Sequence, residues 1–344
     1  MSRQLTADAF KISSESAGAV RVNHAKAGDR HCAGSGGVRF RFGGGDVYSM
    51  MCSRVFGACI RAVVMVSMLA VWSGPAAAQT PSDPNPGALT FTGGFDVPSV
   101  YFFRGIRQEI DADFTMFPYG DIGITLSPKA TINFGVWNSL QTGSSGSDGP
   151  SGKLHYEEDF YATLNLAFGS GFGLGTTYTA YTSPNSMFTT VKEIMFKVTK
   201  SGDIRGFTMN PYGILAFEIG GDDSGSADLG TGGSKGTYLE LGVGPTFPAL
   251  NGRISVAVPV KFGFSLGDYY ELSAGDDHKF GFFDIGALAT FPLSTVGSQF
   301  GSWNIHGGFD YLMLGDTTEN LNLKEDGGTK SSQFIALIGI GVSY

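Results

Sequence analysis

The sequence predicts an all-β chain that closes into an antiparallel transmembrane β-barrel of about 12 strands. Glycine accounts for 52 of the 344 residues, 13% are aromatic and only 16% are charged, a composition typical of many strands and turns. From residue 89 onward, apolar residues recur at every second position in runs that reach 12–15 residues. Strands of globular sheets are usually about 5–6 residues long, whereas about 9–11 residues are needed to cross a membrane at a tilt.

Residues 50–78 predict a secretory signal peptide. Arg54 and Arg61 form its positively charged region, residues 62–72 form an apolar stretch, and the small residues Ala76–Ala78 form a cleavage site. A transmembrane helix is excluded because it would need about 20 apolar residues. The product is therefore expected to be exported.

The first 49 residues are basic and show neither helical nor strand periodicity. Signal peptides begin at the start codon, so we interpret residues 1–49 as a mis-assigned or disordered N-terminal extension, with translation starting at Met50 or Met51. A genuine leader arm is the alternative interpretation.

Removal of residues 1–78 changes the composition of the chain. All three cysteines are lost, and 14 basic and 27 acidic residues remain, so the net charge of −8 becomes −13 over 266 residues. Such a strongly acidic protein is not expected to bind nucleic acid.

Residues 79–88 form a Pro-rich linker, and residues 89–344 form the predicted barrel. Turn residues separate its alternating runs, and no run has the periodicity of an amphipathic helix. We place the twelve runs at 89–103, 113–126, 129–140, 154–168, 172–182, 188–199, 207–219, 237–247, 253–266, 279–291, 302–314 and 331–344.

The alternation is clearest in runs 253–266 and 331–344, where one face is uniformly apolar and the other is small, polar or charged. A soluble β-sandwich also alternates in this way and is the structural alternative. The connections favour the barrel, because short ones such as 127–129 and 169–171 alternate in trend with long polar ones such as 220–236. Outer-membrane barrels show this pattern, and an even number of strands places both termini in the periplasm.

Several prolines fall inside the predicted strands. Proline cannot donate a ladder hydrogen bond, and a closed barrel has no free edge that tolerates it. Bulges or the rims of the barrel are therefore the expected positions of Pro98, Pro211, Pro245 and Pro259.

Three segments of the chain are similar to one known family. They are 99–108 (SVYFFRGIRQ), 135–139 (GVWNS) and 158–161 (EDFY). They resemble the TorF-like outer-membrane porins of proteobacteria, with the resemblance strongest over residues 89–165. Arg107 stands where the family has a small polar residue, and Pro98 interrupts the preceding stretch. The resemblance implies an outer-membrane channel and leaves its solute open.

The chain ends on Tyr344, an aromatic residue at the last position of an alternating strand. This ending resembles the signal by which the barrel-assembly machinery recognises outer-membrane proteins. The machinery and the outer-membrane lipid are thus expected partners, and a homo-oligomer is compatible with the sequence.

The faces opposite the apolar ones are expected to line the lumen, and nine acidic residues against three basic ones predict cation preference. An alternative is a closed network in which these groups pair with one another. The pore-lining candidates are Asp96, Arg104, Asp121, Trp137, Glu157, Asp159, Glu193, Lys197, Glu218, Glu240, Lys261, Asp284, His306 and Asp310.

The expected function is passive diffusion of small solutes through this lumen. Inward aromatics allow a substrate-specific channel as a second hypothesis: Phe102, Trp137, Tyr161, Tyr181, Tyr212, Tyr238 and Phe282. An outer-membrane hydrolase is a third, but His306 is its sole candidate base and no serine motif accompanies it. The sequence calls for no cofactor, metal or catalytic residue.

Overall fold

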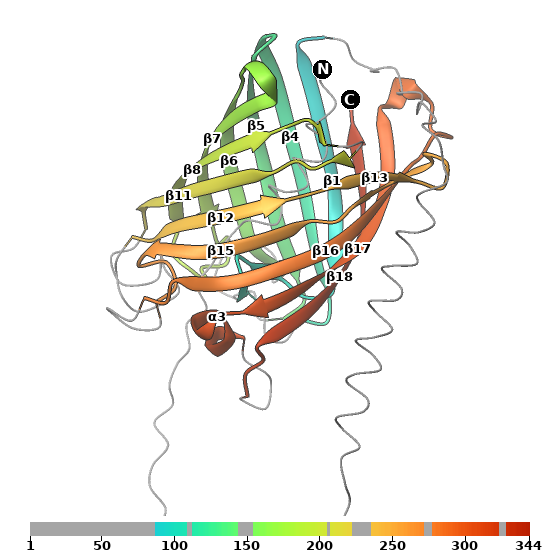
Figure 1. Ribbon diagram of the computed structural model, residues 1–344. Coiled ribbons are helices and arrows are strands. Elements are labelled where there is room, and N and C mark those ends of the chain that lie inside the picture. The colour runs from blue at the N-terminus through green and yellow to red at the C-terminus, as the bar shows by residue number, and fades with distance from the viewer. Residues whose placement is uncertain are drawn as a thin grey trace, which may run out of the picture. The chain divides into compact units, whose positions relative to one another are not determined.

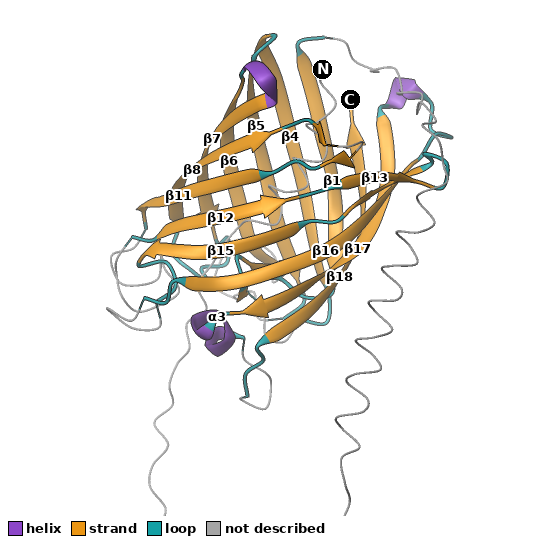
Figure 2. Cartoon of the chain, viewed as in Figure 1, coloured by secondary structure: helices purple, strands orange, loops and turns teal. Residues whose placement is uncertain are grey.

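The computed structural model describes residues 87–108, 112–143, 154–204, 207–221, 235–271, 277–322 and 328–344. The predicted N-terminal extension, the signal peptide and most of the linker lie outside these residues. Figure 2 shows that strands make up most of the described chain. Within it, no helix is long and apolar enough to span a membrane.

Twelve antiparallel strands form the wall of the barrel, and three of them are each divided into two segments. The unbroken strands are β1 (Leu89–Pro98), β4 (Thr115–Ser127), β5 (Ala130–Gln141), β6 (His155–Ala167), β7 (Phe172–Thr182), β8 (Val191–Lys200), β16 (Phe280–Pro292), β17 (Ser302–Leu314) and β18 (Ser332–Ser343). The divided strands are β10 (Phe207–Thr208) with β11 (Tyr212–Gly220), β12 (Thr237–Val243) with β13 (Thr246–Ala249), and β14 (Ile254–Ala257) with β15 (Val260–Gly267).

Each strand pairs with its neighbours in the chain, and the first pairs with the last, so the sheet closes. At this seam Phe95 of β1 lies opposite Ile340 of β18. Beyond β18, the amide of Tyr344 donates to the carbonyl of Phe91, and the amide of Phe91 donates to the carbonyl of Tyr344, at 2.8 and 2.6 Å. The predicted closed antiparallel barrel is confirmed.

The two ends of the barrel differ (Figure 1). Both ends of the sheet, Leu89 and Ser343, lie at the end that carries the short connections, which we call the turn end. The short helix α3 (Asp316–Leu321) lies at the opposite end, together with the strand ends that the long connections join, and we call this the loop end. The helix occurs where the sequence predicts only a loop.

Three prolines explain the divided strands. Pro211, Pro245 and Pro259 each lie in the break between two segments, near the turn end. Hydrogen bonding continues across the breaks because the carbonyls of Pro211, Pro245 and Pro259 still accept amides from Lys200, Val258 and Gly286, at 3.0, 2.9 and 2.9 Å. Pro98 ends β1 instead. The missing proline donors are thus placed where the ladder is already interrupted.

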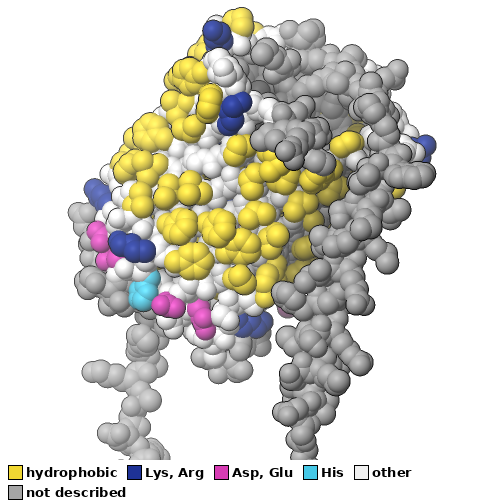
Figure 3. All heavy atoms as spheres, in the orientation of Figure 1, with side chains coloured by type: hydrophobic (Ala, Val, Ile, Leu, Met, Phe, Trp, Pro, Cys, Tyr) yellow, Lys and Arg dark blue, Asp and Glu magenta, His cyan; other side chains and the backbone are white. Residues whose placement is uncertain are grey.

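The outer wall is apolar along every part of the barrel, and Figure 3 shows this surface on one face. Large apolar side chains alternate with inward ones and are about half exposed; examples are Phe95, Phe134, Phe160, Val198, Leu241, Phe309 and Ile338. In the same view, acidic side chains gather toward the loop end. The polar residues on the inner faces are mostly buried.

The predicted run 89–103 is wrong in its second half. The barrel strand ends at Pro98, and the chain then forms a two-stranded hairpin of β2 (Phe102–Phe103) and β3 (Ile106–Arg107) outside the main sheet. The turn of the hairpin has φ of 45° at Arg104 and 82° at Gly105, as in type I′ turns. Tyr101 and Phe103 are buried against inward residues of the wall, so the hairpin packs inside the barrel.

Inward glycines make room for aromatic rings laid across the neighbouring strand. Gly242 of β12 lies opposite Tyr212 of β11, and a Cβ at Gly242 would be 2.3 Å from Cζ of that ring. Gly135 stands in the same relation to Tyr161, at 2.2 Å. The high glycine content thus lets rings pack flat on the inner wall, which residues with a Cβ would prevent.

We expect Gly242→Ala to lower the free energy of unfolding by about 1–3 kcal/mol, because overpacking forces side chains out of their positions. The ring of Tyr212 cannot move freely, since its hydroxyl donates to Glu240 at 2.6 Å. Urea unfolding of the purified barrel measures the change. Gly120→Ala is the matched control, because a Cβ at this strand glycine meets no atom within 4 Å; equal losses in both variants would contradict the packing argument.

Candidate functional site

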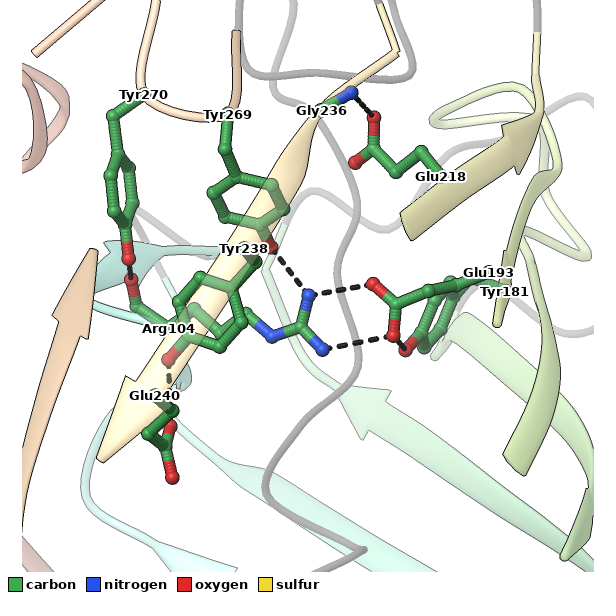
Figure 4. Close-up of polar contacts among 9 residues, drawn as sticks. All are labelled: Arg104, Tyr181, Glu193, Glu218, Gly236, Tyr238, Glu240, Tyr269 and Tyr270. Carbon is green, nitrogen blue, oxygen red and sulfur yellow. Dashed lines mark hydrogen bonds and ion pairs between the residues drawn. The ribbon is translucent and has the colours of Figure 1, made fainter. Parts of the chain in front are cut away.

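The most densely connected polar group inside the barrel is centred on Arg104, at the tip of the hairpin (Figure 4). Its guanidinium donates to both carboxylate oxygens of Glu193 on β8, at 2.7 and 2.9 Å. It also donates to the hydroxyl of Tyr269 at 3.0 Å, while Tyr181 donates to Glu193 at 3.0 Å. Both charged side chains are almost fully buried, so the hairpin is tied to the wall by a bidentate ion pair.

Aromatic rings surround this guanidinium. Its carbon lies 4.1 Å from the ring centre of Tyr238 and 4.8 Å from that of Phe103, and such stacking favours Arg over Lys. The hydroxyl of Tyr270 donates to the backbone carbonyl of Arg104 at 2.8 Å. Burial by itself lowers the pKa of Arg104, but Glu193 outweighs it and the pKa lies well above its usual value. The Arg104 guanidinium therefore stays charged at ordinary pH.

A second aromatic group packs against the start of the hairpin. The ring centre of Tyr101 lies 4.8 Å from that of Phe117 and 5.6 Å from that of Trp137. Tyr156 packs edge-on against Tyr101 at 6.4 Å. All four side chains are buried, so these rings fill the interior around the hairpin.

On the opposite wall, Glu240 accepts hydrogen bonds from Tyr212 and Tyr238, both at 2.6 Å. The ammonium of Lys197 lies 5.2 Å from the ring centre of Tyr212. Among the described residues, these contacts hold the buried Glu240 carboxylate without a direct ion pair.

Lys261 of β15 pairs with Asp284 of β16 at 3.1 Å, and Lys261 keeps a quarter of its side chain exposed. Asp310 of β17 is half-buried beside this pair and lies opposite Gly286. A Cβ at Gly286 would be 2.1 Å from an Asp310 oxygen, so glycine leaves room for this carboxylate.

His306 of β17 is held on both sides. Its Nε2 lies 2.7 Å from Oδ1 of Asp96 and its Nδ1 lies 2.9 Å from Oδ1 of Asn304. Asp121 of β4 accepts a hydrogen bond from Asn133 at 2.6 Å. These carboxylates thus have hydrogen-bond partners.

Two further inward acids lie on β6. Glu157 accepts a hydrogen bond from Tyr101 at 2.8 Å through Oε2. Within the described residues, its Oε1, both carboxylate oxygens of Asp159, the hydroxyl of Ser139 and Nε1 of Trp137 are buried without a hydrogen-bond partner.

Every pore-lining candidate faces inward, although exposure differs widely among them. Arg104 reaches the interior from the hairpin and not from a barrel strand, because β1 ends at Pro98. Lys197, Glu218, Lys261 and Asp310 are half-buried, and the other candidates are buried. Glu218 accepts a hydrogen bond from the amide of Gly236 at 2.8 Å.

The structure brings Arg104, Glu193, Tyr181 and Tyr238 together, although the sequence placed them only on inward faces. Tyr101, Tyr269, Tyr270 and Asn304 were missed as site residues. Tyr269 and Tyr270 follow strand β15, where the sequence indicates only a polar loop. Two adjacent tyrosines in such a loop are the signal from which one could have predicted that this loop turns into the barrel.

No protein-family model matches the chain, and no curated protein matches it. Among solved structures, an outer-membrane channel from Pseudomonas putida F1 is similar to this chain, with a TM-score of 0.43 and 10% sequence identity. The match covers 79% of this chain and 100% of that one. The KdgM porin has a TM-score of 0.39 and 5% sequence identity, and the match covers 74% of this chain and 99% of that porin. An anion-selective porin from Comamonas acidovorans has a TM-score of 0.32 and 8% sequence identity, and the match covers 74% of this chain and 98% of that porin. Likenesses this distant carry no argument about function, and the resemblance to TorF-like porins stays a prediction.

We expect Glu193→Leu to destabilise the folded barrel by about 3–5 kcal/mol, because it leaves Arg104 buried without a counter-charge. The double variant Arg104→Met with Glu193→Leu should recover much of this loss, since both charges are then removed. Urea unfolding of both variants and the wild type measures these differences.

Lys279→Ala is the control for this comparison, because Lys279 forms an ion pair with Asp277 and its side chain is mostly exposed to solvent. Exposed pairs contribute about 0–1 kcal/mol, so little change is expected. A double variant no more stable than Glu193→Leu would contradict the assigned role of the ion pair.

Proposed function

We propose that this chain is a bacterial outer-membrane barrel that lets small solutes diffuse passively through its lumen. The observation that carries the proposal is the apolar outer wall of a closed sheet whose inner faces are polar. Large apolar residues are exposed on neighbouring strands, among them Ile122 on β4, Phe134 on β5 and Phe160 on β6. Soluble monomers rarely expose apolar patches larger than a few hundred Å², whereas lipid requires such a surface.

The closed hydrogen-bond ladder supports the same setting. Each unpaired N–H or C=O in hydrocarbon costs several kcal/mol, so a strand can cross a membrane only within a closed sheet. The predicted signal peptide at 50–78 would export the chain, and the turn end with both termini would then face the periplasm. The barrel-assembly machinery, acting on the end at Tyr344, is the proposed insertion partner.

The hairpin makes the proposed channel narrow. It occupies the interior between the aromatic group of Tyr101 and the ion pair of Arg104 with Glu193. Solutes would pass beside the hairpin, or pass only when the hairpin moves. We therefore propose size selection at the hairpin, in a lumen whose other half is lined by the small and polar residues of the turn end.

Charge selection is the second proposed property. Many inward acids have partners, so the bare ring of carboxylates that the sequence indicates is reduced to a few groups. Lys197, Lys261, Glu218 and Asp310 are the half-buried charges. The pore-lining candidates still comprise nine acids against three bases, which favours cations.

Two other hypotheses have less support. A hydrolase would need His306 to accept a proton, but oxygens of Asp96 and Asn304 occupy both of its ring nitrogens. A stacking track for solutes would need open rings, whereas Trp137, Tyr181, Tyr238 and Phe282 are buried by other side chains.

Replacing residues 101–107 by a short Gly-Ser linker should raise the single-channel conductance several-fold, because it removes side chains from the narrowest part of the lumen. Planar-bilayer recording measures the conductance, and heat-modifiable migration on a gel shows that the variant still folds. Leu250→Ser, in an exposed turn at the other end, is the control and should leave conductance unchanged. A folded linker variant with wild-type conductance would count against the hairpin as the constriction.

Asp310→Asn should reduce the preference for cations, measured as the reversal potential across a salt gradient, because it removes a half-buried negative charge from the lumen. Asp316→Asn is the matched control, since that side chain is 82% exposed on α3. Anion preference in the wild type would contradict the proposed charge selection.

A further inference from the structure

The inward faces of β5 and β6 carry a group of buried polar atoms that the hairpin and the pore do not use. Trp137 lies directly opposite Asp159, and Ser139 lies directly opposite Glu157. Directly paired residues on one face have Cβ atoms about 4.5–5.5 Å apart. Each of the four side chains is at most 1% exposed. We call this group the β5–β6 cluster.

The oxygens of the cluster are not satisfied by the rest of the described chain. Oε1 of Glu157, both carboxylate oxygens of Asp159 and Oγ of Ser139 have no hydrogen-bond partner there. The backbone of Thr182 lies near Asp159 but makes no hydrogen bond of good geometry with it. Buried polar atoms are satisfied in more than about 90% of cases, so four neighbouring exceptions indicate a missing partner.

Charge gives the sign of that partner. Glu157 and Asp159 are within hydrogen-bonding reach of each other, and two adjacent carboxylates in a low-dielectric interior repel strongly. The buried guanidinium of Arg104 already forms a bidentate pair with Glu193. Tyr101 offers Glu157 a neutral hydroxyl alone. When ionised, the two carboxylates of the cluster would therefore have no ion pair with a described residue.

We propose that the β5–β6 cluster binds a calcium ion. Calcium takes only oxygen ligands, 6–8 of them at about 2.3–2.6 Å, with carboxylates and neutral oxygens mixed. Glu157, Asp159 and Ser139 supply four oxygens, and water completes the shell. Two carboxylates balance a divalent charge, whereas a shared proton would neutralise one carboxylate and leave the Ser139 hydroxyl without a role.

The position of the cluster gives the ion a structural task. Tyr101 begins the hairpin and donates to Glu157, so a calcium ion at Glu157 would join β5, β6 and the hairpin. Because the cluster is buried, the ion would enter during folding and leave slowly. The proposal does not depend on whether the lumen conducts.

The test compares full-length barrel folded with calcium chloride and barrel folded with a chelator. After dialysis, wild type folded with calcium should retain a stoichiometric ion by elemental analysis and unfold at a higher temperature. Terbium folded into the same site should show luminescence sensitised by the neighbouring Trp137. Trp137→Phe should remove most of that signal and keep the calcium, which locates the ion beside this ring.

Two variants test the ligands. Asp159→Asn and Ser139→Ala should each weaken calcium retention on the order of tenfold or more, and Ser139→Ala is the milder change should Asp159→Asn fail to fold. Asp316→Asn on the exposed helix α3 is the acidic control and should retain the ion. Wild type that retains no calcium, or retention unchanged by both cluster variants, would overturn the proposal.

Discussion

Closure of the sheet is the constraint on which the rest of the structure depends. Because β1 pairs with β18, no strand in the described wall of the barrel presents a free row of amides and carbonyls. The three prolines of the divided strands are tolerated only in breaks at one level of the wall, where their carbonyls still accept. Closure also forces alternate side chains inward, so the interior has to be filled by residues whose polar atoms find partners.

The interior meets this demand in two ways. First, Arg104 joins the hairpin to Glu193, and aromatic rings exclude water around both charges. Second, hydroxyls of Tyr212 and Tyr238 satisfy Glu240, which forms no direct ion pair with another described residue. Low dielectric strengthens these contacts and equally penalises any charge left without one.

Much of the fold could be predicted from the sequence, because period-two alternation and turn residues directly determine which faces are apolar. The inward positions of Glu157, Asp284 and Asp310 follow from that parity alone. The contacts between these side chains could not be predicted in this way. Alternation tells which face of the sheet a residue occupies, but it tells neither which residue it contacts nor how deeply it is buried. The hairpin was misassigned because Tyr101–Phe103 continue the apolar pattern of β1, and only Arg104–Gly105 mark the turn.

The seam at Tyr344 has a consequence for the order of folding. Its hydrogen bonds with Phe91 join positions separated by almost the whole barrel, whereas the other strand pairs are local in the chain. Local hairpins close quickly, while a contact of such sequence separation bears the largest entropy of loop closure. Pairing of Tyr344 with Phe91 therefore completes the seam late, and until it forms, the first strand has an edge open to a templating partner.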